Sequence, residues 1–263
     1  MSGAASATGA TADDPRSVEV TTILGVPFAL LSFEQAAGCI ETILHRPGPT
    51  MHVVLANAHT LNLATEDAGY RDVLAQADIV LRDGVGVELA ARLTGARPGH
   101  NFVGTDFVPT LLRVLGARVE GVSVHLLGGR DGVALEAAHV LLRQIPGLRV
   151  VGVESGFGDL DGAVPRIRAA SPDVLLVALG NPLQEQWINR HRDELGTPVA
   201  IGVGALFDYL AGRVSRAPRW VLRLRSEWLF RLIIEPRRLW RRYVVGNPRF
   251  LVRVLRDLWR GRA

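Results

Sequence analysis

The sequence predicts an α/β fold: a mostly parallel, Rossmann-like sheet with helices on both faces, followed by a basic amphipathic helical appendage. Short apolar runs alternate with segments of helical spacing, which is typical of a parallel sheet covered on both sides. Glycines and polar residues gather where these runs end, and the composition changes near Gly212. With 263 residues and 48% hydrophobic content, the chain can form one large domain, alone or with an appendage.

A hairpin and a helix are expected before the alternation begins. Residues 17–31 predict two short strands. A helix then runs to about His45, with Ser32 as its N-cap and Gln35 three residues later, which is the spacing of a capping box.

From residue 52 onward, apolar runs predict buried strands and the segments between them predict helices. The predicted strands are 52–57, 78–83, 122–129, 148–153, 173–180 and 198–204. The predicted helices are 58–77, a helix that follows Gly86 and ends near Gly95, then 104–116, 131–144, 162–170 and 182–195. A capping Thr105 or Asp106 is expected to open the helix at 104–116.

Composition excludes several classes of protein. The single cysteine, Cys39, rules out an internal disulfide, and no Cys/His cluster has the spacing of a zinc site, so a reducing compartment is favoured. Residues 1–16 are small, polar and acidic, which predicts a disordered tail and no signal peptide. No apolar run approaches the roughly 18 residues of a membrane-spanning helix.

Residues 213–263 differ from the rest of the chain in charge. They hold 15 arginines against three acids, a balance of +12, whereas residues 1–212 balance to −8; the net charge is +4. Four of the five tryptophans also lie in this segment. We therefore divide the ordered chain into an α/β domain, residues 17–212, and a helical appendage, residues 213–263.

Several predicted strands end in turns that contain glycine. These turns are residues 83–86, 128–130, 180–182 and 202–204. In open parallel sheets, ligands bind beyond the carboxyl ends of the strands, where helix N-termini offer free N–H groups. A nucleotide or sugar nucleotide is therefore the expected ligand, although glycine also serves tight turns in any parallel α/β protein.

Five ordered segments carry a resemblance to a known family. They are residues 77–95, 104–106, 177–188, 201–220 and 227–242. With these segments the chain resembles the WecG/TagA/CpsF glycosyltransferases from about residue 18 to its end.

The resemblance implies a bacterial inverting glycosyltransferase. The expected donor is a UDP-sugar, and the expected acceptor is a polyprenyl-diphosphate-linked saccharide in teichoic acid, common antigen, capsule or exopolysaccharide synthesis. Such a protein is expected to need no metal and no cofactor, and to work in the cytoplasm, peripherally on the inner face of the cytoplasmic membrane. A homo-oligomer is left open.

A carboxylate is needed to take the proton of the acceptor hydroxyl as that oxygen attacks the anomeric carbon. Asp83 is our choice, because it follows a strand on the expected site edge and matches the family's proposed base. The alternative is that Asp83 only caps the next turn or helix. Asp106 and Asp208 compete for this role, each with an N-cap or structural alternative, and Asp208 is kept as a substrate-binding candidate.

Asn57 ends a strand on the same edge, and the family match favours a contact with the donor sugar. An ordinary turn asparagine is the alternative. Many family members carry threonine where this chain has Leu55, and Glu or Asp where it has His59. Both departures bear on the identity of the donor sugar.

Gln184 and Glu185 lie in the first turn of a helix that Pro182 is expected to open. The resemblance favours Gln184 in the active site, while Glu185 is expected either to bind substrate or to interact with the helix dipole. Glycines at the strand ends are further candidates for lining the nucleotide site. They are Gly84, Gly128, Gly129, Gly202 and Gly204.

The appendage combines apolar residues at helical spacing with arginines on the remaining faces. An anionic membrane surface is the expected partner of such helices, and packing on the α/β domain is the alternative. Arg231, Arg238 and Arg241 would lie along one side of a helix if Pro236 only kinks it. The family match places these three in the active site, where guanidinium groups suit diphosphate oxygens.

Three other functions are alternatives to the transferase. The basic, tryptophan-rich appendage also suits nucleic acid, but the domain has the layout of a small-molecule enzyme and no nucleic-acid partner is expected. A catalytically idle scaffold of a polysaccharide assembly complex is another alternative. A Rossmann dehydrogenase is not favoured, because no G-x-G-x-x-G with an acidic partner follows an early strand.

Overall fold

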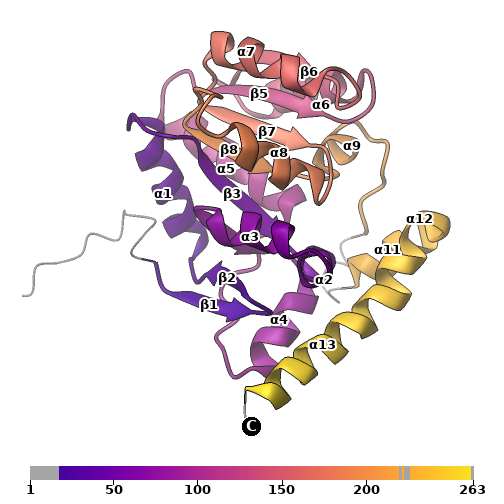
Figure 1. Ribbon diagram of the computed structural model, residues 1–263. Coiled ribbons are helices and arrows are strands. Elements are labelled where there is room, and N and C mark those ends of the chain that lie inside the picture. The colour runs from indigo at the N-terminus through magenta and orange to yellow at the C-terminus, as the bar shows by residue number, and fades with distance from the viewer. Residues whose placement is uncertain (1–17, 219–220, 222–225, 262–263) are drawn as a thin grey trace, which may run out of the picture.

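The computed structural model describes residues 18–218, 221 and 226–261, without the side chain of Arg238. Its centre is a six-stranded sheet of order β4-β3-β8-β7-β5-β6, in which every pair is parallel (Figure 1). The strands are β3 Met51–Ala56, β4 Ile79–Arg82, β5 Ser123–Gly128, β6 Arg149–Glu154, β7 Val174–Ala178 and β8 Val199–Gly202. The predicted α/β class and parallel sheet are confirmed. The predicted tail, residues 1–16, lies outside the described residues.

A two-stranded antiparallel hairpin precedes the sheet, and helices follow most strands. The hairpin is β1 Val20–Ile23 with β2 Val26–Ala29. The helices are α1 Phe33–Leu44, α2 Ala58–Glu66, α3 Ala68–Gln76, α4 Val85–Leu93, α5 Gly104–Arg118, α6 Val133–Gln144, α7 Leu160–Ala170, α8 Leu183–His191 and α9 Leu206–Leu210. The capping box of Ser32 and Gln35 at α1 is confirmed.

Both faces of the sheet are covered by helices, because successive strand residues point to opposite sides. In β3, Val53 and Leu55 pack against α1 and α5, whereas Val54 and Ala56 pack against α2, α3 and α4. A third cluster joins α7 and α8 to the same face as Val54, beneath β7 and β5. The carboxyl ends of the parallel strands consequently meet at one edge of the sheet.

Two local expectations were wrong. The predicted helix 58–77 is broken at Asp67, whose carboxylate accepts the Tyr70 N–H at 3.1 Å and so caps a second helix. Neither Thr105 nor Asp106 caps α5, because that helix already begins at Gly104 after Val103. One aspartate side chain that accepts a backbone hydrogen bond was enough to divide the predicted helix 58–77 into α2 and α3.

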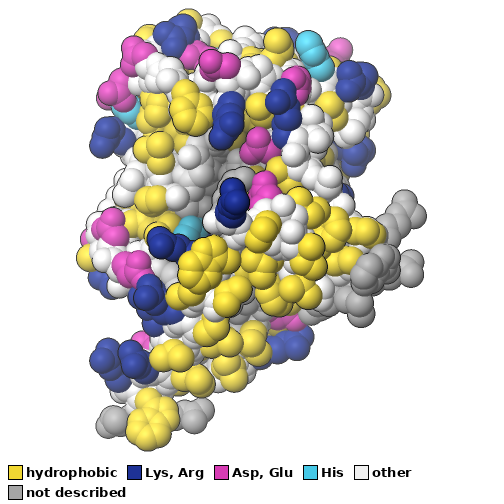
Figure 2. All heavy atoms as spheres, turned by 90° about the vertical axis from the view of Figure 1, so that its right-hand side faces the viewer, with side chains coloured by type: hydrophobic (Ala, Val, Ile, Leu, Met, Phe, Trp, Pro, Cys, Tyr) yellow, Lys and Arg dark blue, Asp and Glu magenta, His cyan; other side chains and the backbone are white. Residues whose placement is uncertain are grey.

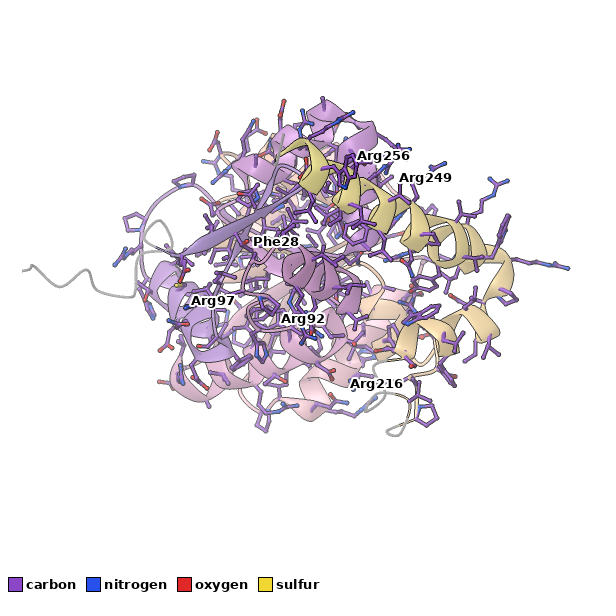
Figure 3. The ribbon with its side chains drawn as sticks, turned by 90° about the horizontal axis from the view of Figure 1, so that it is seen from below. Phe28, Arg92, Arg97, Arg216, Arg249 and Arg256 are labelled. Atoms are coloured by element: carbon purple, nitrogen blue, oxygen red, sulfur yellow. The ribbon has the colours of Figure 1, made fainter. Side chains whose placement is uncertain are left out.

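The appendage runs along the edge where the strands end (Figure 1). It comprises α11 Glu227–Ile234, α12 Pro236–Trp240, the π-helical turn η2 Arg241–Val245 and α13 Gly246–Arg260. One side of α13 packs on α2 and α4, where Phe250 and Val254 are fully buried. Figure 3 shows Arg249 and Arg256 projecting from the same helix.

Polar contacts add to this docking of α13 on α2. Arg253 donates to the backbone carbonyl and the side-chain oxygen of Asn62, at 3.0 and 2.8 Å. Glu66 accepts from Arg249 and from Arg253, at 3.2 and 2.7 Å. The side-chain amide of Asn62 donates to the Gly246 carbonyl at 2.8 Å. The start of α13 is therefore fixed to α2 by apolar and polar contacts together.

Replacing Phe250 with alanine is expected to weaken this docking strongly. Removing a fully buried phenylalanine costs about 3–5 kcal/mol, so α13 should lose hydrogen-exchange protection and the protein should unfold at lower denaturant. Trp259→Ala on the same helix is the control, since that side chain is 83% exposed. Equal protection of α13 in the two variants would contradict the docking described here.

Candidate active site

Asp83 and Asn57 lie side by side on the carboxyl edge of the sheet. Asp83 follows β4 and its backbone N–H donates to Ala56 at the end of β3, at 2.8 Å. Asn57 follows β3, and its side-chain N–H donates to the Asp83 carboxylate at 3.4 Å. Figure 2, which looks at this side of the molecule, shows a hollow flanked by arginine and acidic side chains.

The orientation of Asn57 is set by the helix that it caps. Its side-chain oxygen accepts the N–H groups of His59 and Thr60, at 3.0 and 3.3 Å, at the start of α2. The amide nitrogen is thereby turned toward Asp83. Asn57 therefore acts here as a helix cap and as the group that positions the Asp83 carboxylate.

The surroundings of Asp83 make it a stronger base than an exposed aspartate. Burial raises its pKa to about 6, and the charge of Glu227 acts in the same direction. The hydrogen bond from Asn57 and the positive charges of Arg242 and Arg231 partly offset this. A carboxylate that is ionised at neutral pH, yet has a pKa near it, is suited to accept a proton in catalysis.

Charged residues of α11 in the appendage act electrostatically on this carboxylate. The Arg231 guanidinium carbon lies 5.2 Å from the centre of the Tyr209 ring, and the Tyr209 hydroxyl donates to Glu227 at 3.3 Å. Nε of Arg231 is buried and has no hydrogen-bond partner among the described residues. An unsatisfied, charged donor beside a carboxylate is suited to an anionic substrate group.

Gln184 joins two turns of the same edge. Its side-chain oxygen accepts the N–H of Gly180 after β7, at 3.2 Å, and of Gly204 after β8, at 3.0 Å. Its amide nitrogen donates to Glu185 at 2.7 Å. Gln184 is only 2% exposed. Its position is that of a residue that orders the site edge.

Glu185 is fully buried beneath these turns. It accepts hydrogen bonds from the Tyr70 hydroxyl at 2.9 Å, from Asn181 at 2.7 Å and from Gln184. Burial raises the pKa of Glu185 to about 7, against the lowering effect of these hydrogen bonds. The predicted interaction with the helix dipole is thus secondary to a buried hydrogen-bond network, and no atom of Glu185 reaches the surface.

Comparison with known proteins shows the family of this chain. The model of the glycosyl transferase WecG/TagA/CpsF family matches residues 21–263. The chain belongs to this family. It is 34% identical over 195 residues to the N-acetylglucosaminyldiphosphoundecaprenol N-acetyl-beta-D-mannosaminyltransferase of Bacillus subtilis (strain 168), covering 74% of this chain and 75% of that one. The enzyme of the same name from Staphylococcus aureus (strain NCTC 8325) is 30% identical over 222 residues, 83% of this chain and 86% of the relative.

The expected helix carrying three arginines is not continuous in this WecG/TagA/CpsF family member. α11 ends at Ile234, and α12 starts at Pro236 after Glu235, whose φ of −121° and ψ of 57° are not helical. Arg241 is exposed and lies 5.8 Å from the centre of the Trp240 ring. The side chain of Arg238 lies outside the described part, so its predicted role stays a prediction.

Arg242 is the residue that the sequence interpretation missed. Its positive charge acts on Asp83 and on His59. Burial is the main cause that lowers the pKa of His59 to about 4, and the charge of Arg242 adds to it. The sequence did contain a signal, because Arg242 follows Arg231 by eleven positions, which would be about three turns of a continuous helix. The π-helical turn could not be read from periodicity.

The strand-end glycines have packing reasons of their own. A Cβ at Gly128 would lie 2.5 Å from the carbonyl oxygen of Ala178, and one at Gly202 would lie 2.7 Å from the Gln184 side chain. Gly129 and Gly204 have positive φ. Their N–H groups donate to the Ala178 carbonyl and to the side-chain oxygen of Gln184. Their predicted role in lining a nucleotide site therefore stays a prediction beside these structural roles.

Three further predicted positions have local roles. Gly84 has a φ of +90° and donates its N–H to Asn101 at 2.7 Å, which fixes the turn after Asp83. Asp208 is half-buried in the first turn of α9 and is not its N-cap. Leu55 points into the core against α5. Threonine at position 55 would place its hydroxyl in that apolar layer.

Metal ligation has no support among the residues that the structure describes. No group of three or more His, Cys, Asp or Glu side chains gathers there. An Asp-x-Asp pattern does occur at Asp159–Asp161, which the sequence interpretation passed over. Asp159 caps α7 by accepting the Gly162 N–H at 3.0 Å, and Asp161 lies 3.3 Å from His191. Both serve local structure beyond β6, the strand at the opposite end of the sheet from β4.

Proposed function

We propose that this chain is an inverting glycosyltransferase that moves a sugar from a UDP-sugar to a saccharide linked to polyprenyl diphosphate. The observation that carries the proposal is the Asp83 carboxylate, raised in pKa to about 6 and held by Asn57, with arginine charge from the appendage facing it. The names of the relatives support an N-acetylglucosaminyl-diphosphate-polyprenol acceptor and an N-acetylhexosamine donor. Teichoic acid linkage synthesis is one of the settings that the family resemblance implies.

The proposed step is a single displacement with inversion. The acceptor hydroxyl oxygen bonds to the anomeric carbon while the bond from that carbon to the β-phosphate oxygen of UDP breaks. The electron pair of the broken bond leaves on UDP, and the hydroxyl proton passes to Asp83. Arg231 faces the same position, where its charge would stabilise the negative charge that grows on the leaving diphosphate.

The test is transfer in a defined mixture. Purified protein is incubated with N-acetylglucosaminyl-diphosphate-polyprenol and a panel of UDP-sugars, and UDP release and the anomeric configuration of the product are followed with and without a chelator. Chelator-resistant release with one donor and an inverted product is the expected result. No release with any donor, together with no UDP binding, would contradict the proposal and favour the scaffold alternative.

We also propose that the appendage binds an anionic membrane surface on the cytoplasmic side. No helix of the described residues is both long and apolar enough to cross a bilayer. Figure 2 shows a broad apolar region over the appendage with arginines around it. Its most exposed large side chains are Ile233, at 71%, and Trp259, at 83%. Apolar anchors combined with basic residues are typical of helices that lie in the membrane interface.

Replacing Ile233 and Trp259 with serine is expected to weaken binding to vesicles containing phosphatidylglycerol. Burying one such side chain contributes about 1.5–3 kcal/mol, so the partition coefficient should fall more than about tenfold. Sedimentation with vesicles measures it. Leu142→Ser on α6 is the control, because Leu142 is 43% exposed but lies on the α/β domain. The same partition for both variants would remove the appendage as the membrane-binding surface.

A further inference from the structure

The docking of α13 determines where the preceding turn must lie. The Asn62 side chain donates to the Gly246 carbonyl at 2.8 Å, and Arg253 donates to the same Asn62 and to Glu66, so the first residue of α13 is fixed beside α2. One turn earlier on each segment are Arg242 and His59. The electrostatic effect of Arg242 on His59 agrees with that placement.

The π-helical turn gives neighbouring arginines different surroundings. Arg241 is exposed and stacks near the Trp240 ring, whereas Arg242 is half-buried and lies 5.7 Å from the centre of the Tyr243 ring. Such turns are rare and occur often at functional sites, because they shift the register of one side chain. Here the turn directly precedes Gly246, which is bonded to Asn62 of α2, and the N-cap of that helix, Asn57, donates to Asp83.

We propose that Arg242 is an active-site residue that faces Asp83 and binds the diphosphate of a substrate. The inference rests on the proposed transfer, and it names a residue outside the Arg231, Arg238 and Arg241 set. A guanidinium group supplies the fork of donors that matches two phosphate oxygens. Its charge also stabilises the carboxylate form of Asp83, which is the form that accepts the acceptor proton.

The charged groups around Asp83 determine how removal of Arg242 changes the pKa of Asp83. Arg242 from η2 and Arg231 from α11 lower the pKa of Asp83, as does the neutral Asn57, whereas Glu227 from α11 raises it. Taking away the charge of Arg242 therefore raises the pKa of Asp83 further above 6. The acid limb of the pH dependence of kcat/KM moves to higher pH in consequence.

The test compares Arg242→Ala and Arg242→Lys in the full chain. Arg242→Ala is expected to shift the acid limb upward by about half a pH unit or more and to weaken diphosphate binding at least about tenfold. Calorimetric binding of UDP and the KM for the lipid-linked acceptor show which diphosphate is bound. Arg242→Lys keeps the charge but not the fork, so its acid limb should stay near that of wild type while diphosphate binding weakens.

Arg237→Ala removes the same charge from an exposed position of the appendage and is the matched control. Arg241→Ala is expected to leave the acid limb in place, whatever it does to turnover. An unmoved limb together with unchanged UDP and acceptor binding in Arg242→Ala would overturn the inference. A wild-type protein that shows no transfer would instead contradict the proposed function, and UDP binding by the Arg242 variants would still test the residue.

Discussion

Asp83→Asn is expected to lower kcat for sugar transfer by about 10³-fold, which is within the usual contribution of a general base. The amide keeps the size of the side chain and its position beside Asn57, but it cannot accept the acceptor proton. Binding of UDP is expected to change by less than about twofold, because the carboxylate is not needed to hold the donor. Steady-state rates and calorimetric titration with UDP measure the two quantities.

The pH dependence adds a second expectation for the same residue. With a pKa of about 6, Asp83 should give the wild-type kcat/KM an acid limb whose midpoint is near pH 6, and the residual activity of Asp83→Asn should lack it. Because burial raises this pKa above that of the unfolded chain, the ionised carboxyl destabilises the fold as the pH rises past 4 to 6. Asp83→Asn should therefore melt no lower than wild type at pH 7.5.

Asp106→Asn is the control for Asp83→Asn. Its carboxylate is exposed on α5 and pairs with Arg216, so turnover should stay within about twofold of wild type. If Asp83→Asn kept more than a tenth of the wild-type rate, another group would have to be the base.

The fold could be predicted from the sequence because buried parallel strands leave a strong pattern. Five of the strands, β3, β4, β5, β7 and β8, are buried along their whole length, whereas β6 at the edge of the sheet was predicted to be buried and is only half-buried. The turns that follow the buried strands contain the glycines and polar residues expected at a site edge. The same pattern placed Asp83 and Asn57 at the same edge of the sheet. Their hydrogen bond follows from the β3–β4 pairing, which the chain order alone suggests.

The features that could not be predicted from the sequence depend on competition between side chains and the helix backbone for hydrogen bonds, and on tertiary contacts. The break at Asp67 depends on a side-chain acceptor competing with the helix backbone, and the position of Arg242 depends on a π-helical turn held by α2. Gly128 reads as a ligand-binding glycine, although the close approach of Ala178 is sufficient reason for it. Sequence patterns predict which edge carries the site, whereas packing decides which atoms of that edge remain available.

Gln184→Glu is expected to make the stability of the protein fall steeply as the pH rises. The change replaces the amide nitrogen that donates to Glu185 at 2.7 Å with a second carboxylate oxygen, while both residues are almost fully buried. Two buried carboxyl groups whose oxygens are this close cannot both be ionised, so Glu185 and the new glutamate must share a proton. The turns at Gly180 and Gly204 could still donate to the remaining oxygen, which allows the variant to fold while that proton is present.

A carboxyl whose pKa is raised on folding holds its proton more tightly in the native state, so stability falls as the pH rises past that pKa. Wild type already has one such group, since burial raises the pKa of Glu185 to about 7. In Gln184→Glu the additional loss between pH 5.5 and 8.5 should reach about 3 kcal/mol, which is typical of an unpaired buried charge. Urea unfolding at the two pH values measures it.

Gln35→Glu makes the same chemical change at the exposed capping box of α1, where glutamate is also favoured. This control should lose no more stability between the two pH values than wild type does. If Gln184→Glu lost no more than that control, Gln184 would not be the donor that keeps Glu185 satisfied and the two site turns in place.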